Sequence, residues 1–136
     1  MPAAAQGRGA RSAKAFVRYY IATINYAVAT GDVQQLRPLA DRNCVSCKAI
    51  ARTVNRIYDG GGTIKSRGWV LRSLSPVPLQ PRARPIFDLG VFETPQDVHQ
   101  SAASKVKHYE GGKQPMTIHL RFTNSGWKVS QLDLVS

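Results

Sequence analysis

Cys44 and Cys47, spaced as C-x-x-C, are the residues of this chain whose types and spacing are most specific for chemistry. Both lie at the start of a predicted helix, where the helix dipole stabilises a thiolate. A thioredoxin-type redox pair follows a β-strand, however, and here the preceding element is a predicted helix. The pair can therefore be a structural disulfide, two free thiols, or a redox or metal-binding pair. A disulfide across so short a loop gains little from chain entropy and would mainly fix the first turn of the helix.

Other catalytic and metal-binding arrangements are incomplete in this sequence. Asp88 could act as an acid in a cavity, but Phe87 and Leu89 are the better inward candidates, and the alternation of a strand then turns Asp88 outward. Gly60–Gly62 follow a helix instead of opening one, so they do not form a phosphate loop. No zinc site is expected, because no paired spacing relates the three histidines His99, His108 and His119. The sequence predicts no catalytic residue, metal or cofactor, and it favours a non-enzymatic role.

The positive charge of the chain is large and unevenly distributed. The formal net charge is +11, and residues 1–87 hold 14 of the 19 lysines and arginines against three acids. Residues 88–136 hold five bases and five acids. Such a field attracts nucleic acid, anionic lipid head groups or anionic wall polymers, or it forms only a solvated surface.

The candidate anion-binding residues are Lys48, Arg52, Arg56 and Arg18. The first three are four residues apart, so they form a stripe along one side of a predicted helix. Arg18 lies on the polar side of the preceding helix. This set could follow a row of phosphates. Because the sequence has no DNA- or RNA-binding motif and few exposed aromatic residues, it favours an anionic polymer over nucleic acid.

Tyrosines on the first predicted helix form a candidate pocket. Tyr20 belongs to the apolar face of this helix, whereas Tyr19 and Tyr26 share a flank. Tyr19 and Tyr26 either pack against a neighbouring element or form a pocket rim, where their phenol oxygens would orient a ligand.

The elements that position these residues follow from hydrophobic periodicity. Residues 1–12 have no period and indicate a mobile tail. An apolar face with a period of 3.6 predicts a helix over 13–29, with Gly31 as its end. Asp32 is expected to cap a short helix that ends near Pro38, and Asn43 can cap a third helix over about 44–59. A period of two then predicts strands at 63–75, 85–94, 104–109, 116–124 and 127–134.

Helices followed by a meander of strands predict a single α+β domain over 13–136, with helices packed in a curved antiparallel sheet. The sheet must curve around the first helix to bury its large apolar residues, which are Trp69, Phe87, Leu89, Ile118, Leu120 and Trp127. A cone-shaped sheet around helices is the architecture of the nuclear-transport-factor-2-like (NTF2-like) and cystatin-like group.

Four motifs resemble a family of uncharacterised actinobacterial lipoproteins: AFVRYY at 15–20, NYA at 25–27, TGD at 30–32 and C-x-x-C at 44–47. The resemblance covers most of residues 15–75. It implies a secreted, lipid-anchored domain of NTF2-like fold at the extracellular face of the cell envelope, and it implies no activity. In such an exported protein, the two cysteines are expected to form a disulfide.

The sequence therefore predicts a non-enzymatic cell-envelope domain that binds an unknown ligand or envelope partner. No apolar run is long enough to span a membrane, and the first residues have no apolar region typical of a signal peptide. Membrane attachment would then need a lipid anchor that this chain lacks. The alternative is a cytoplasmic protein that binds a polyanion or nucleic acid through its basic helical face, and a native start at Met1 would favour it.

Overall fold

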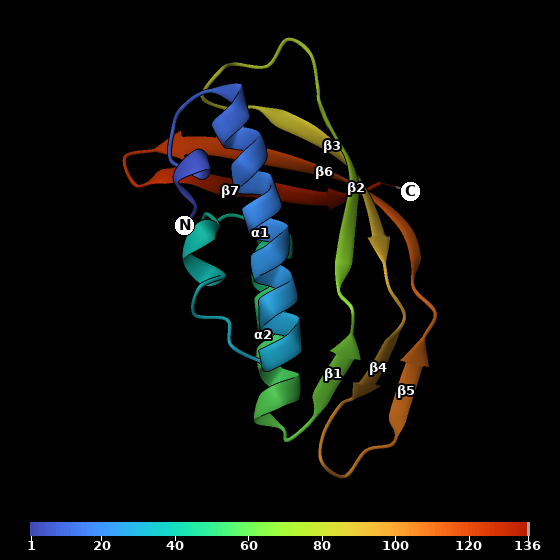
Figure 1. Ribbon diagram of the computed structural model, residues 1–136. Helices are drawn as coiled ribbons and strands as arrows, with labels where there is room; N and C mark the ends of the chain where they lie inside the picture. The colour runs from blue at the N-terminus through green and yellow to red at the C-terminus, as the bar shows by residue number, and fades with distance from the viewer. Residues whose placement is uncertain (136) are drawn as a thin grey trace.

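The computed structural model describes residues 1–135 as two long helices on one side of a strongly curved antiparallel sheet (Figure 1). The helices are α1 (Ala10–Thr30) and α2 (Val45–Asp59), and a 3-10 helix (Arg37–Leu39) lies between them. The strands are β1 (Thr63–Ser66), β2 (Trp69–Pro76), β3 (Ile86–Glu93), β4 (Gln96–His99), β5 (Val106–Tyr109), β6 (Gly112–Thr123) and β7 (Gly126–Leu134). The predicted α+β class and cone-like arrangement are confirmed.

The strands form two hydrogen-bonded groups that follow one another along the chain. One has the order β2-β3-β6-β7, the other the order β1-β4-β5, and every pairing is antiparallel. Two-residue connections join β1 to β2, β3 to β4 and β5 to β6. Three chain segments therefore cross from one group to the other, and the sheet bends at these connections.

Two glycines allow this bend. Gly68 and Gly111 have φ values of 86° and 76°, which favour glycine. The carbonyl of Gly68 accepts hydrogen bonds from the backbone N–H and the hydroxyl of Thr94, at 3.2 and 2.8 Å. A Cβ on Gly111 would lie 2.2 Å from the carbonyl oxygen of Glu93. The single strand predicted over 63–75 is thus broken at Gly68 into β1 and β2.

The helices differ from the prediction mainly at their starts. Helix α1 begins at Ala10 and not at Ala13, and Gly31 ends it as predicted, with a φ of 81°. The residue that caps α2 is Cys44 and not Asn43, because the Cys44 sulfur accepts the backbone N–H of Cys47 at 3.3 Å. The segment after Asp32 forms only a turn and the short 3-10 helix.

The residues before α1 contact the sheet, which the predicted tail over 1–12 does not account for. Residues Ala3–Ala5 form a 3-10 helix, and Ala5 is fully buried. The indole N–H of Trp127 in β7 donates to the carbonyl of Gly7 at 2.8 Å.

The core lies between the helices and the concave face of the sheet. Five of the six residues predicted to be core are buried, namely Phe87, Leu89, Ile118, Leu120 and Trp127, and Trp69 is half-buried. The inward face of α1 supplies Phe16, Tyr20 and Ile24, which are all close to fully buried. The alternating pattern of β6 therefore predicted its buried face correctly.

Candidate functional site

A concave cavity of about 450 Å³ lies between α2 and the bent part of the sheet. Thr53 and Ile57 of α2 form one wall. The opposite wall comes from β1, β4 and the β5–β6 connection, and includes Gly111 at the bend. We call it the concave cavity. Its volume is typical of a site for a small ligand.

The lining of the concave cavity combines an apolar floor with hydrogen-bonding side chains. Ile57, Ile64 and Val98 form the floor, and each is less than 9% exposed. Around them lie one hydroxyl, three amides and one phenol, from Thr53, Gln96, Gln100, Gln114 and Tyr109. Such a surface suits a ligand with an apolar part and several groups that hydrogen-bond.

Glu93, at the end of β3, gives the concave cavity its most distinctive group. Its side chain is half-buried, and the burial raises the pKa of this carboxyl. Within residues 1–135 no hydrogen-bond or ion-pair partner faces the carboxylate. Glu110 and Lys113 also line the cavity, and Glu110 already contacts the His108 ring at 3.1 Å. The cavity therefore has more acids than bases, in a chain of net charge +11.

The two cysteines are joined in the structure. A disulfide links Cys44 to Cys47 across the first turn of α2. Cys44 is 1% exposed and Cys47 is 4% exposed. Neither sulfur lines the concave cavity, so the pair fixes the helix start and not this site.

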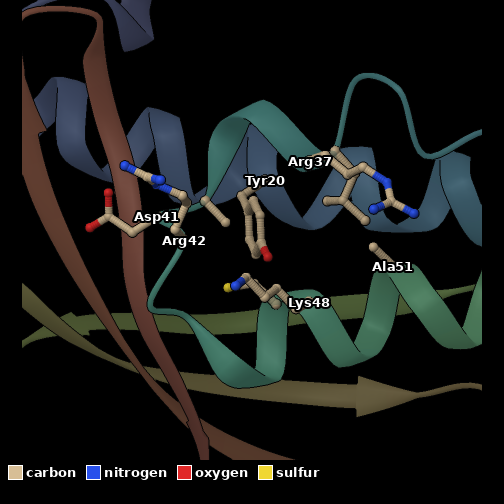
Figure 2. A pocket seen from close by; sticks show the side chains of 9 residues that line it. Tyr20, Arg37, Asp41, Arg42, Lys48 and Ala51 are labelled. Carbon is tan, nitrogen blue, oxygen red and sulfur yellow. The ribbon is translucent and has the colours of Figure 1, made fainter.

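The predicted anion-binding residues lie on α1 and α2, and one of them also lines a pocket. Lys48, Arg52 and Arg56 are exposed along α2, as their spacing predicts, and none forms an ion pair within the described chain. Lys48 alone also lines a small second pocket, next to Tyr20 and Arg42 (Figure 2). Arg18 is exposed on α1, where the polar side of the helix faces solvent.

The three tyrosines of α1 lie in different surroundings. Tyr19 is half-buried and packs on the core, and Tyr26 is 45% exposed. Neither lines the concave cavity or the pocket that contains Lys48. Tyr20, which the apolar pattern assigned to the core, also lines that second pocket.

Asp88 and the three histidines each contact a nearby side chain or backbone group. Asp88 is exposed and accepts a hydrogen bond from the Thr117 hydroxyl at 3.2 Å. The predicted outward orientation is therefore confirmed. The three histidine rings contact different groups, Ser104 O for His99, Asp97 and Glu110 for His108, and Asp133 for His119.

Sequence reasoning missed the concave cavity residues because they come from segments with weak patterns. The strand β4 has only one buried residue, Val98, and Pro95 precedes it, so no strand was predicted there. Glu93 ends an apolar strand and had no signal of its own. The pair Gly111 and Gly112, where β6 begins, was the available sign of a bend.

Comparisons with known proteins agree with this architecture. A family described as a family of unknown function (DUF6318) matches residues 1–133. No curated protein matches the chain. The intermembrane-space region of the chloroplast protein ARC6 is similar in structure, with a TM-score of 0.67, 12% identity, and 93% of this chain and 96% of that chain covered.

A second solved structure names the fold. It is an NTF2-like protein with a cystatin-like fold from Novosphingobium aromaticivorans, with a TM-score of 0.53, 14% identity, and 89% of this chain and 79% of that chain covered. At such identities the likeness concerns the fold alone. This fold, with two helices packed against antiparallel strands, is the predicted NTF2-like one. In the described residues, no helix is both long and apolar enough to cross a membrane.

Proposed function

This chain belongs to DUF6318, a family of unknown function, and we propose that it is a non-enzymatic ligand-binding domain that acts in the cell envelope. The ligand binds in the concave cavity between α2 and the bent sheet. The observation that carries this proposal is the Glu93 carboxylate, which is half-buried above an apolar floor and has no hydrogen-bond or ion-pair partner within residues 1–135.

The lining of the concave cavity defines the class of ligand. A burial that raises the pKa of Glu93 also makes a partner for its carboxylate favourable, so the ligand presents a cation or an N–H or O–H donor there. Ile57, Ile64 and Val98 take an apolar portion of the ligand. Anions are disfavoured, because Glu93 and Glu110 outnumber the single base of the lining, Lys113.

Location in the envelope has separate support. The Cys44–Cys47 disulfide uses both cysteines of the chain, and disulfides persist mainly in oxidising compartments. The motifs at 15–20 and 44–47 resemble those of lipid-anchored envelope proteins. Alkylation of the native protein in acid-quenched cells tests this location. Intact mass spectrometry should find no labelled thiol before reduction and two after it, and two labels before reduction would contradict an envelope location.

A charge-sorted fragment titration tests the ligand class. ¹⁵N-labelled protein is titrated with cationic, neutral and anionic fragments, and backbone amide shifts are followed by NMR. Cationic and neutral fragments should shift the amides of Val98 and Gln114, and anionic fragments should not. Glu93→Gln should weaken the binding of cationic fragments by about tenfold, because a charge-assisted hydrogen bond is lost.

Filling the concave cavity provides the matched control. Gln114 projects into the cavity from β6, so Gln114→Trp should abolish the fragment shifts. Gln131→Trp adds the same bulk on an exposed position of β7 and should leave them unchanged. Equal binding by both variants, or fragment binding confined to other surfaces, would overturn the proposal.

A second candidate function rests on the stripe Lys48, Arg52 and Arg56, which is exposed and without ion pairs in the described chain. We propose that this face binds an anionic polymer. Changing all three residues to Gln should keep the free energy of unfolding within about 1 kcal/mol, because surface changes rarely cost more.

The same triple variant should bind heparin or teichoic acid more weakly and with a shallower salt dependence, because fewer counterions are released. Titrations at two salt concentrations, with duplex DNA as a third polymer, measure this. Salt-insensitive or absent binding by the unmodified protein would reduce the stripe to a solvated face. Tight DNA binding would favour the cytoplasmic alternative.

A further inference from the structure

The second pocket, of about 160 Å³, lies between α1, the segment that joins the helices, and α2 (Figure 2). It shares no lining residue with the concave cavity. We call it the Tyr20 pocket. Its apolar walls come from Leu36, Ala40, Cys47 and Ala51, and three of its other lining residues are cationic, namely Arg37, Arg42 and Lys48.

The hydroxyl of Tyr20 is the unusual group in this pocket. The residue is 0% exposed, and its hydroxyl has no hydrogen-bond partner within residues 1–135. Figure 2 shows the hydroxyl end of the ring pointing toward α2, where Lys48 and Ala51 lie. A buried hydroxyl without a partner is unfavourable, so a ligand group that accepts a hydrogen bond from it would be stabilised there. Burial also raises the pKa of this phenol, which keeps it protonated and able to donate.

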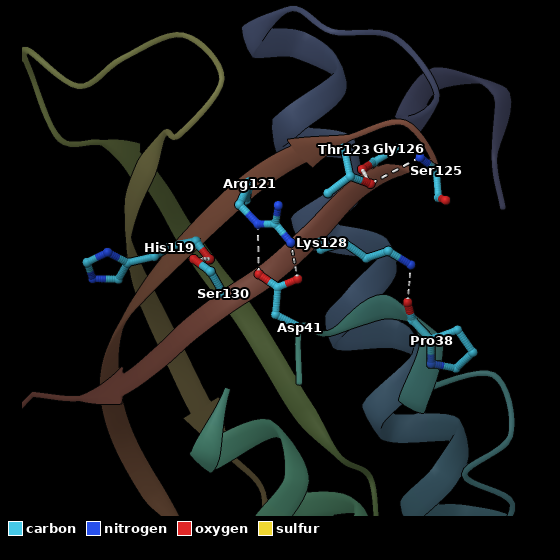
Figure 3. Close-up of polar contacts among 9 residues, drawn as sticks. All are labelled: Pro38, Asp41, His119, Arg121, Thr123, Ser125, Gly126, Lys128 and Ser130. Carbon is cyan, nitrogen blue, oxygen red and sulfur yellow. Dashed lines mark hydrogen bonds and ion pairs between the residues drawn. The ribbon is translucent and has the colours of Figure 1, made fainter. Parts of the chain in front are cut away.

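The charge around the Tyr20 pocket is positive, although one acid lines it. Asp41 contacts Arg121 through both carboxylate oxygens, from Nη2 to Oδ1 at 2.6 Å and from Nε to Oδ2 at 3.0 Å (Figure 3). The Asp41 carboxylate is therefore already paired with Arg121. Arg37, Arg42 and Lys48 form no ion pair within the described residues, so their charge remains available to a ligand.

The segment that carries Arg37 and Arg42 is held in place by the sheet. The backbone N–H of Asp41 donates to the carbonyl of Val129 in β7 at 2.8 Å, and Lys128 donates to the carbonyl of Pro38. With the Asp41–Arg121 pair, these contacts join the segment to β6 and β7 (Figure 3). The backbone that carries Arg37 and Arg42 is therefore pre-organised, which lowers the entropy cost of binding.

We propose that the Tyr20 pocket binds a small tetrahedral oxyanion of the phosphate class, either free phosphate or the phosphate group of a small monoester. The Tyr20 hydroxyl donates to one oxygen, and Lys48 lies over the same group. Arg37 and Arg42 lie on opposite sides of the ring, with their guanidinium ends directed away from it, and they add positive charge around the site (Figure 2). A short alkyl part of a monoester rests on Leu36 and Ala51. This site is independent of the concave cavity.

Amide NMR and isothermal titration with sodium phosphate, at pH 7 and constant ionic strength in a buffer without oxyanions, test the proposal. The unmodified protein should bind phosphate saturably below about 10 mM, with shifts at Arg42 and Lys48. Acetate should bind more weakly, because one carboxylate has less charge for three cations. Glycerol 3-phosphate tests whether a monoester binds more tightly than the free ion.

Two variants separate this site from the general positive field. Tyr20→Phe removes only the unpaired oxygen, so the melting temperature should not fall, while phosphate affinity should drop about tenfold. Lys48→Gln should lower the phosphate affinity at least as much. Arg52→Gln removes one charge a turn further along the stripe, outside the pocket, and should change affinity less than about twofold in 0.15 M salt.

Three results would overturn the proposal. They are the absence of saturable phosphate binding, unchanged affinity in Tyr20→Phe, and equal losses in Lys48→Gln and Arg52→Gln. The first would mean that water alone occupies the pocket, and the others would mean that only the surface field attracts the ion. Gln114→Trp should leave phosphate binding intact, so failure of the concave cavity and failure of this site are distinguishable.

Discussion

One carboxylate, Asp41, connects the segment between the helices to the sheet. Its side chain is 15% exposed, and the Arg121 guanidinium that donates to it lowers the pKa of the carboxyl. A carboxyl whose pKa is lower in the folded state stabilises the fold above its unfolded pKa, and this contribution is lost as the pH falls through the folded pKa. Asp41 therefore stabilises the protein at neutral pH and not in acid.

We predict that Asp41→Asn lowers the melting temperature at pH 7 by roughly 2–4 °C, since Arg121 is partly exposed and water screens the pair. The difference from the unmodified protein should shrink as the pH falls below about 4. Calorimetry between pH 2 and pH 7 measures both effects. Asp59→Asn, at an exposed carboxylate without an ion pair in the described chain, is the control and should change little at any pH. A deficit that persists at pH 2 would mean that packing, and not charge, stabilises this contact.

At the same scale, the sequence predicted burial better than it predicted hydrogen bonding. The period of α1 placed Tyr20 on the buried face correctly, but a period says nothing about partners for a hydroxyl. Whether Tyr20 has a partner depends on the segment around Ala40 and on α2, which only the folded chain brings together. The stripe from Lys48 to Arg56 was predictable because it depends on one helix alone.

Among the elements, α1 and the bend between β1 and β2 are joined by the side chain of Asn25. Its Nδ2 donates to the carbonyl of Trp69 at 2.9 Å, and its Oδ1 accepts the N–H of Trp69 at 2.8 Å. The amide thus pairs with Trp69 as a neighbouring strand would. A Cβ on Gly68 would lie 2.6 Å from this amide, so the contact of Asn25 with Trp69 requires a glycine at position 68.

Asn25→Ala should reduce the free energy of unfolding by about 2–3 kcal/mol, because it leaves two half-buried backbone groups of Trp69 unpaired. Denaturant unfolding gives the energy, and hydrogen exchange should show a faster Trp69 amide. Asn55→Ala on α2 is the control, since it makes the same change on a helix at a half-buried side chain for which the structure shows no hydrogen bond. Equal losses in both variants would indicate that the Asn25 amide does not support the bend.

The remaining elements show which patterns carried information. The strand β6 was predictable because apolar residues alternate strictly over 116–122. The break at Gly68 and the strand β4 were not, because they depend on pairing between β1, β4 and β5, which are distant in sequence. The concave cavity lies beside this bend and was therefore beyond prediction from periodicity.

For the whole molecule, the order of the elements was enough to predict the fold class. Helices in the first half and strands in the second predict helices packed on one face of an antiparallel sheet, here the concave face. Lipid anchoring and envelope location stay predictions, because the fold does not test them. The uneven charge alone predicts a basic surface and no particular ligand. It indicates a specific ligand only at the pocket that Lys48 and the buried phenol of Tyr20 both line.

The closure of the molecule depends on Trp127, which joins the first residues of the chain to the last strand. The indole is 1% exposed, its N–H donates to the carbonyl of Gly7 at 2.8 Å, and its ring meets Phe122 edge-on with centroids 4.9 Å apart. It therefore fills the core and also holds the segment before α1.

We predict that Trp127→Ala reduces the free energy of unfolding by about 3–5 kcal/mol, as truncation of a large buried aromatic side chain does. Trp127→Phe keeps most of the apolar contact and loses the bond to Gly7, so it should cost less. Hydrogen exchange separates the two roles, because Trp127→Phe should expose the Ala5 amide, which otherwise donates to the carbonyl of Pro2 at 3.0 Å, and leave β7 protected. An unchanged unfolding midpoint in Trp127→Ala would contradict closure of the core by β7. Equal exchange at Ala5 in all three proteins would mean that the segment before α1 does not depend on the indole.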